Sequence, residues 1–518
     1  MFEGHPKGLW ALALANTGER FGYYTMLAVF LFFLQDNFGF SMGTSSSIQA
    51  AFLGIVYFVP LFGGMLADKF GFGKMVTSGI VIMFLGYLLL SLPLGAGAVA
   101  LGVMALALLF ICVGTGLFKG NLQVLVGNLY DDPKYSAKRD EGFSIFYMAI
   151  NLGSMFAAAV ALSIMAWAQD SLGISKGDSY HYAFAVACVS LILSIVIYYA
   201  FRKTFAHADR AKIATPGAEV VEEELTPAQT KERIICLCLV FAVVIFFWMA
   251  FHQNGITMNQ FAREYTATSE TGFMSLFLSK SLSFTEIRSF WNLLLCVITV
   301  YGVLNIFQSK TAKGKTVASL ITVASVGVLV YKSMNVGGLA PVAVEAPIFQ
   351  QFNPCFVVAL TPIIGIIFGA LAKKGKEPSS PMKIGLGMLV AAMAFVVLMV
   401  ASIGLPPAEE QAAAVAAGTA TLVSPNWLIS TYFVLTIAEL LLSPIGISFV
   451  SKVAPPKYKG MMMGGWFVAT AIGNFLIMVP GLMWGMNLSI IWGVLIAICL
   501  VSAAFIFSIL KRLEAVAK

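Results

Sequence analysis

Long apolar segments separated by short polar loops run along almost the whole chain. Fourteen of them reach the length of about 20 residues that a helix needs to cross a bilayer. They are 8–35, 47–68, 75–95, 98–125, 142–168, 182–202, 233–262, 289–308, 316–334, 348–372, 382–404, 426–451, 460–484 and 487–511. The longest polar stretch, 203–232, divides six segments from eight. The pattern predicts an all-α polytopic membrane protein with fourteen spans.

The composition supports this interpretation. Of the 518 residues, 59% are hydrophobic and 11% are charged, whereas soluble proteins carry about 25% charged residues. The first residues, MFEGHPKG, run straight into an apolar segment, so we expect no cleaved signal peptide. All seven cysteines lie in apolar runs. We therefore expect them to pack in the membrane, and we expect neither disulfides, a metal site nor a cofactor.

The distribution of basic residues predicts the orientation. With the N-terminus in the cytoplasm, 25 of the 32 Lys and Arg residues fall in cytoplasmic loops or at the two ends, and only 5 fall outside. Short loops rich in Lys and Arg stay in the cytoplasm. Both termini are therefore expected in the cytoplasm, and the protein is expected to lie in the cell inner membrane. The net charge of +7 follows from topology, and we expect no nucleic-acid partner.

A few charged side chains lie inside the apolar segments. Glu19, Arg20, Lys119 and Glu439 are clear cases, and His252 is a borderline fifth. An unpaired charge at the centre of a span costs about 3 kcal/mol or more. These residues therefore mark either a partner or a water-filled cavity.

Helical spacing places these residues on polar stripes. Positions three and four apart lie on one helix face, and six spans carry such a face. The stripes are Asn16, Glu19, Arg20, Tyr23 and Tyr24; Thr115, Lys119 and Gln123; Tyr147, Asn151 and Ser154; Trp248, His252, Gly255 and Asn259; Tyr432, Thr436, Glu439, Ser443 and Gly446; and Trp466, Thr470 and Asn474. One shared, water-accessible cavity accounts for all six.

The signs of the charges differ between the two halves of the chain. The first half supplies Arg20 and Lys119 together with Glu19, and the second half supplies Glu439. A cavity that is positive at one end and negative at the other suits a zwitterion, with its carboxylate at the first half and its ammonium group at the second.

Several motifs resemble, in order, those of the proton-dependent oligopeptide transporters, a branch of the major facilitator superfamily. GERFGYY resembles the first-span signature Glu-x-x-Glu-Arg-Phe-x-Tyr-Tyr, and FWMAFHQNG resembles Phe-Trp-x-x-x-x-Gln. The other motifs are GGMLADKFGFGK (63–74), GTGLFKGNLQ (114–123), FSIFYMAINLGS (143–154), FNPCFVVALTP (352–362) and TIAELLLSPIGISFVSKVAP (436–455). The resemblance covers nearly all of the chain outside 263–334.

The resemblance implies a major facilitator fold of twelve core helices in two six-helix bundles, with two extra helices. The expected parts are a first bundle at 1–202, the linker 203–232, a second bundle at 233–512, an outer loop at 263–288 and an extra hairpin at 289–334 between core helices seven and eight. The implied function is import of di- and tripeptides by alternating access, driven by a proton gradient. We expect a monomer in the bilayer and no catalytic residues.

The resemblance also implies roles for single residues. Arg20 and Lys119 would bind the peptide carboxylate, and Glu439 would bind the amino terminus with Asn151 and Asn353. A Lys119–Glu439 ion pair would close the cavity in one state. Side-chain pockets would be lined by Tyr23, Tyr24, Tyr57, Trp248 and Trp466, with Thr470 on the stripe of Trp466.

The chain departs from the family pattern at three site positions. Asn16 replaces the first Glu of the signature, Leu27 replaces an Arg, and His252 replaces an acid. In the family, that Arg and that acid pair across the outer gate. Here Leu27 is expected to face His252, so the gate should close by packing or hydrogen bonds. The candidate proton carriers are Glu19, Lys119, His252 and Glu439.

The residues leave alternatives open. Asn151 and Asn353 could simply link helices by hydrogen bonds, and single aromatic residues could simply pack. A fourteen-span drug/proton antiporter or an uncoupled peptide facilitator would share the fold. The charges of the two halves argue against a lipophilic cation as substrate. The spans carry no paired aspartates, Ser/His pair or HExxH motif, which argues against an intramembrane enzyme.

Overall fold

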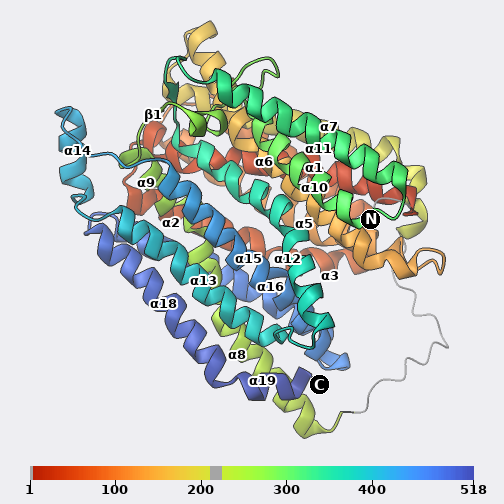
Figure 1. The fold of residues 1–518 in the computed structure, drawn as a ribbon. Helices are drawn as coiled ribbons and strands as arrows, with labels where there is room; N and C mark the ends of the chain where they lie inside the picture. Colours follow the sequence, from red (N-terminus) through yellow and green to blue (C-terminus); the bar gives the residue numbers. More distant parts are fainter. Residues whose placement is uncertain (1–3, 210–224, 518) are drawn as a thin grey trace.

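Helices make up almost all of the structure, a computed structural model that describes residues 4–209 and 225–517 (Figure 1). The first half of the chain forms α1 (Lys7–Phe38), α2 (Met42–Phe58), α3 (Pro60–Phe70), α4 (Phe72–Leu90), α5 (Ala98–Asn128), η1 (Ser136–Lys138), α6 (Arg139–Leu172), α7 (Lys176–Ala200), η2 (Arg202–Thr204) and η3 (Ala206–Ala208). These helices cover the first six expected spans.

The second half is also helical, with one small sheet. It forms α8 (Pro227–Phe251), η4 (His252–Gly255), α9 (Thr257–Glu264), β1 (Ser269–Glu270), η5 (Phe273–Phe277), α10 (Trp291–Gln308), α11 (Ala312–Asn335), β2 (Val342–Ala343), η6 (Ala346–Gln351), α12 (Phe352–Lys373), α13 (Ser380–Ala401), α14 (Ala408–Ala416), α15 (Asn426–Val453), η7 (Pro456–Tyr458), α16 (Lys459–Leu476), α17 (Met478–Leu482), α18 (Leu488–Ser508) and α19 (Leu510–Ala517). The helix α14 lies in a loop for which the sequence pattern predicted no element.

Among the described residues, thirteen helices are long and apolar enough to cross a membrane. The remaining expected span is α1, which has 32 residues but carries Glu19 and Arg20 in its first half. Fourteen crossings are compatible with the structure, and that number stays a prediction.

The helix α8 begins earlier than the apolar pattern indicated. Thr226 caps it, because the Thr226 hydroxyl accepts from the Gln229 amide and the Gln229 side chain accepts from the Thr226 amide. This capping box and Pro227 at the first helical position stabilise a polar first turn that hydropathy alone does not reveal. Residues 210–224 of the expected linker lie outside the described residues.

Two long spans are interrupted where they approach the site. Pro60 lacks an amide proton, and it separates α2 from α3 because it cannot continue the backbone ladder. The span of α8 breaks into the 3₁₀ turn η4, and Ile256 then leaves the helical region with φ −119° and ψ −93° before α9 begins. The break leaves His252 at the end of one helical segment.

Buried apolar side chains form two clusters, one mainly from α1–α7 and one mainly from α8–α19. The clusters meet at the helix breaks, where Ile256 and Ile477 of the second half pack into the first cluster. Met155 and Ala159 of α6 pack into the second. The helix α2 also contacts α16 and α17, and α6 contacts α12. The assignment of two six-helix bundles stays a prediction.

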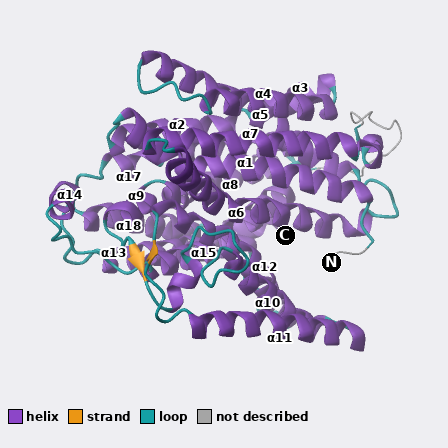
Figure 2. Ribbon diagram, turned by 90° about the horizontal axis from the view of Figure 1, so that it is seen from above, coloured by secondary structure: helices purple, strands orange, loops and turns teal. Residues whose placement is uncertain are grey.

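The pair α10 and α11 lies at one edge of the molecule (Figure 2). Few of its side chains are buried, and the helices join through a hydrogen bond from Thr299 to Ser325 of 2.8 Å. Tyr301 donates to the carbonyl of Val358 in α12. The pair therefore contacts the rest of the protein along one face.

The beginning of α1 and the C-terminal α19 lie at one end of the molecule, opposite α14 and the β1–β2 sheet (Figures 1 and 2). In that sheet Ser269 pairs with Ala343 in antiparallel register. We call the end that carries α14 the closed end, because the two halves join there through residues of α1 and α9, described below.

Gly63 provides a test of the packing between α3 and α5. A Cβ atom at Gly63 would lie 2.1 Å from the carbonyl oxygen of Gly116, whereas a Cβ at the neighbouring Gly64 meets nothing within 4 Å. Gly63→Ala should lower the free energy of unfolding by about 1–3 kcal/mol because the helices must separate. Gly64→Ala should be neutral or stabilise by up to about 1 kcal/mol. Thermal unfolding in detergent compares the two, and equal midpoints would contradict the close approach.

Candidate functional site

Arg20 and Glu19 form a buried ion pair in the middle of α1. The guanidinium donates from Nε to Glu19 Oε2 and from Nη2 to Oε1, both at 2.5 Å. The side chains are only 4% and 1% exposed. The Arg20 guanidinium also lies 4.6 Å from the centroid of the Tyr23 ring. Glu19 thus neutralises and orients Arg20, so an incoming anion meets a guanidinium that is already held in place.

Lys119 of α5 lies beside the same group. Its ammonium nitrogen is 4.1 Å from the centroid of the Tyr57 ring. Arg20 and Glu19 lie within its electrostatic range. Within residues 4–209 and 225–517, Lys119 makes no ion pair with Glu439. Lys119 therefore presents a cation held mainly by an aromatic ring.

Glu439 of α15 is the acidic counterpart. Asn353 Nδ2 donates to its Oε2 at 2.9 Å, and the same amide contacts Thr436 Oγ1 at 3.1 Å. Tyr147 of α6 lies near the same carboxyl group. Among the described side chains, Glu439 therefore has neutral groups as neighbours and no cation. Glu439 itself is only 7% exposed.

Tyr24 connects the basic and acidic groups. Tyr24 lies within range of electrostatic interaction with Tyr57 and Arg20 and also with Glu439. The structure thus brings Arg20, Lys119 and Glu439 around one space, with α1, α2, α5, α6, α12 and α15 contributing side chains.

His252 makes a different contact from the one expected. Its Nδ1 donates to Asn474 Oδ1 of α16 at 2.6 Å, and its ring stacks on Trp248 with centroids 4.9 Å apart. Asn474 in turn donates to the carbonyl of Leu53 in α2 at 3.4 Å. The neighbour that the structure gives His252 in the first half is Tyr57. The expected pairing with Leu27 is not among these contacts.

Three predicted residues are engaged in packing or in their own helices. Trp466 is 2% exposed and lies against Gly446, where an added Cβ would come within 2.2 Å of the Trp466 ring. Thr470 donates to the carbonyl of Trp466 at 2.9 Å. Asn151 donates to the carbonyl of Tyr147 at 3.1 Å. The donated protons of these two polar groups are thus used within their own helices, whereas the Thr470 oxygen and the Asn151 carbonyl oxygen can still accept.

Two predicted residues carry buried donors that make no hydrogen bond within the described part of the chain. They are the Tyr23 hydroxyl and the Trp248 indole Nε1. A buried donor without a partner costs about 1–3 kcal/mol. A polar ligand that reached them would therefore gain hydrogen bonds at little further desolvation cost.

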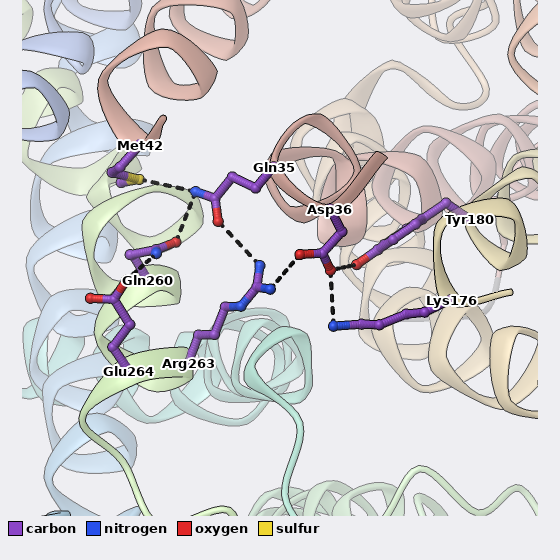
Figure 3. A network of polar contacts seen from close by, with 8 residues as sticks. All are labelled: Gln35, Asp36, Met42, Lys176, Tyr180, Gln260, Arg263 and Glu264. Atoms are coloured by element: carbon purple, nitrogen blue, oxygen red, sulfur yellow. Dashed lines mark hydrogen bonds and ion pairs between the residues drawn. The ribbon is translucent and has the colours of Figure 1, made fainter. Parts of the chain in front are cut away.

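The sequence analysis missed Tyr147 and Asn474 as site residues, although both lie on its polar stripes. It also missed the contacts at the closed end. There Arg263 of α9 forms an ion pair with Asp36 of α1 (Figure 3). The sequence analysis considered an ion pair only at positions 27 and 252 and not at the ends of the helices, so it did not anticipate this one.

The closed-end contacts form a continuous network. Arg263 also donates from Nη1 to Gln35 Oε1 at 3.1 Å, and Gln35 Nε2 donates to Gln260 Oε1 at 3.0 Å. Lys176 and Tyr180 of α7 contact the Asp36 carboxylate at 2.9 and 2.7 Å. Burial alone would raise the pKa of Asp36, but the hydrogen bonds from Tyr180 and Arg263 outweigh it and lower the pKa below its ordinary value.

Comparisons with known proteins extend over most of the chain. Residues 73–222 and 328–480 match the sequence profile of the POT family. An uncharacterized transporter of Bacillus subtilis is 28% identical over 483 residues, which cover 91% of this chain and 86% of the relative. A peptide transporter of Yersinia enterocolitica is 28% identical over 501 residues, which cover 91% and 87%.

A crystal structure of a peptide transporter in complex with alafosfalin superimposes with a TM-score of 0.72 at 23% identity. The match covers 100% of this chain and 97% of that chain. Together with the thirteen apolar helices, it confirms the expected all-α polytopic fold class.

The lowered pKa of Asp36 predicts a pH dependence of stability. A carboxylate whose pKa is lower in the folded state stabilises the protein above its unfolded pKa of about 3.9, and this contribution is lost as pH falls through the lowered value. Asp36→Asn should thus lower stability by roughly 1 kcal/mol at pH 7, and the difference from wild type should shrink below about pH 4.

Thermal unfolding in detergent between pH 7 and strongly acidic buffer measures this difference. Asp170→Asn is the control, because Asp170 is an exposed carboxylate of α6 and its removal should change little. A constant difference between wild type and Asp36→Asn at all pH values would contradict the contribution assigned to the ionised carboxylate.

Proposed function

Because this chain belongs to the POT family, we propose that it is a secondary transporter that imports di- and tripeptides by alternating access. The observation that supports this most is the charge distribution of the site. Arg20 and Glu439 both lie near Tyr24, and Lys119 lies near Arg20, so the first half contributes the cations and the second half the carboxylate. Such a dipolar site matches a molecule with a carboxylate at one end and an ammonium group at the other.

The contacts suggest how a peptide would bind. Its carboxylate would meet Lys119, which has no competing ion pair with Glu439, and the guanidinium of Arg20 on the side that Glu19 does not occupy. Its ammonium group would meet Glu439, whose carboxylate Asn353 orients. A buried carboxylate without a cation is costly, so a positively charged substrate group gains energy there.

The remaining predicted residues would shape the pocket. Tyr23 and Trp248 have free donors for the peptide backbone, and Tyr24 and Tyr57 lie between the charged groups. Asn151, Trp466 and Thr470 would line the side-chain pockets, although the two polar groups bond to their own helices in this conformation. A Lys119–Glu439 ion pair would form in a different state, when the site closes without peptide.

Alternating access requires the site to open at one end and then at the other. Here the halves join at the closed end through Arg263 and Asp36. We assign the closed end to the outside and both termini to the cytoplasm, in the inner membrane, because 25 of the 32 Lys and Arg residues then lie on the cytoplasmic side. A monomer contains every site residue named here.

Proton coupling is a separate part of the proposal. Glu19, Lys119, His252 and Glu439 are the titratable groups at the site. An uncoupled facilitator is the second candidate, and it is favoured by Asn16, Leu27 and His252 at positions where the family carries ionisable groups. The hydrogen bond of His252 to Asn474 also suits a purely structural role.

Uptake of a labelled dipeptide into liposomes tests transport and coupling together. Wild type should accumulate peptide above the external concentration when an inward proton gradient is imposed. The variant His252→Gln can still hydrogen-bond to Asn474 but cannot carry a proton, so it tests whether His252 is the proton carrier. Equal accumulation with the same pH profile in both proteins would exclude His252 as the proton carrier. Equilibration without accumulation in wild type would establish the facilitator, and no uptake of any peptide would contradict the proposed function.

Glu439→Gln tests the assignment of the two peptide ends. It should weaken binding of a dipeptide with a free amino terminus about 30-fold or more, since a buried charge would lose its partner. Binding of the same dipeptide with an acetylated amino terminus should change far less. Calorimetric titration of both ligands measures the ratio, with unfolding curves to verify the fold. Equal losses for the two ligands would remove Glu439 from the amino-terminal contact.

A further inference from the structure

The contacts at the closed end differ in whether they cross between the two halves. Arg263 of α9 reaches two consecutive residues of α1, because it forms an ion pair with Asp36 and donates to Gln35 (Figure 3). Its guanidinium also lies 4.8 Å from the centroid of the Phe32 ring. Gln35 adds a second crossing contact, to Gln260. One side chain of the second half thus holds the last turns of α1.

The first half holds its side of this contact independently, because Asp36 keeps Lys176 and Tyr180 of α7 as partners. On the other side Gln260 keeps its hydrogen bond to Glu264, which also accepts from Trp484 at 2.9 Å. Breaking the crossing bonds would therefore leave neither Asp36 nor Gln260 without a partner. Arg263 would lose its bonds to Asp36 and Gln35, but its side chain is 32% exposed and can meet water. The contact can thus open without stranding a fully buried polar group, which is the property a reversible latch needs.

The ion pair lies at a different place from the pair expected from the family, whose two positions are occupied here by Leu27 and His252. Leu27 and His252 cannot form an ion pair, and His252 is bonded to Asn474 within the second half. The crossing pair lies farther along both helices, with the acid on α1 and the cation on α9. Its side chains are 14% and 32% exposed, so water and salt reach it more readily than they reach the Glu19–Arg20 pair.

We infer that Arg263, with Asp36 and Gln35, is the latch that holds the closed end shut, and that Lys176 only orients Asp36 from within its own half. This inference rests on the proposed alternating access, in which the closed end opens. A partly exposed ion pair is weak and is screened by salt. The latch therefore sets the balance between the closed and open conformations without making either one permanent.

A distance measurement across the closed end tests the latch without requiring transport. Spin labels at Leu172→Cys and Met486→Cys, both exposed and on opposite halves, report the distance between the halves. The background carries Cys238→Ser and Cys296→Ala, since the other five cysteines are buried. Arg263→Gln should raise the ratio of open to closed molecules about 3- to 20-fold.

Lys176→Gln is the matched control, because it removes one positive charge from the same carboxylate but breaks no bond between the halves. It should leave the ratio within about twofold of wild type. Asp36→Asn should raise the ratio, and the double variant Asp36→Asn/Arg263→Gln should shift it no further than the larger single effect. High salt should raise the ratio in wild type and much less in Arg263→Gln.

An unchanged distance distribution in Arg263→Gln, or an equal shift in Lys176→Gln, would overturn the inference. The variant Arg263→Lys keeps the positive charge but lacks the forked guanidinium that reaches both Asp36 and Gln35. A shift between those of wild type and Arg263→Gln would support the contribution of the bond to Gln35. If a variant loses its helical content or elutes as an aggregate, Asp36→Asn and the salt dependence of wild type decide the question. Peptide uptake is scored separately, so a shift in distance without any uptake would support the latch and contradict the proposed function.

Discussion

A charged side chain inside a membrane span is stable only when polar groups or water replace its hydration. Glu19 and Arg20 meet this requirement by binding each other, which leaves α1 with no net charge at that depth. Lys119 relies on the face of Tyr57, and Glu439 relies on Asn353. Because Lys119 and Glu439 have no counter-ion among the described residues, the site retains a basic side and an acidic side. The proposed binding of a zwitterion depends on that residual polarity.

The same constraint explains how the two halves are joined. Apolar side chains form two clusters that meet near Ile256 and Ile477, and the helix breaks beside those residues bring polar groups to the boundary. Asn474 is an example, because it bonds both to His252 in its own half and to the backbone of Leu53 in the other. Neutral hydrogen bonds suffice at this depth. The ion pair between the halves lies instead at the end of the helices, where water lowers the cost of separating the charges.

Moving an ion pair from the cavity to the end of the helices changes its physical character. A pair inside the cavity would be strong and would compete with a charged substrate for the same groups. Arg263 and Asp36 are partly exposed. Among the described residues their partners, besides each other, are Gln35, Phe32, Lys176 and Tyr180, none of which is proposed to bind peptide. Closing of this end and binding of substrate are therefore carried by different side chains, and they are coupled only through the movement of the helices.

The sequence alone determined the class of protein, nearly all of the helices and the residues that carry charge in the membrane. Hydropathy and helical periodicity are local properties, so they were sufficient to place Arg20, Lys119 and Glu439 on polar stripes and to predict one shared space. Hydropathy did not place every helix correctly. The helix α8 begins earlier, at a polar capping box, and α14 lies in a segment where no span was predicted.

The partners of each side chain were decided by tertiary structure. Tyr147 and Asn474 lay on the predicted stripes, but only packing showed that one reaches Glu439 and the other His252. Arg263 and Asp36 belong to helices far apart in the chain, and periodicity within one helix carries no information about which residue of another helix lies opposite.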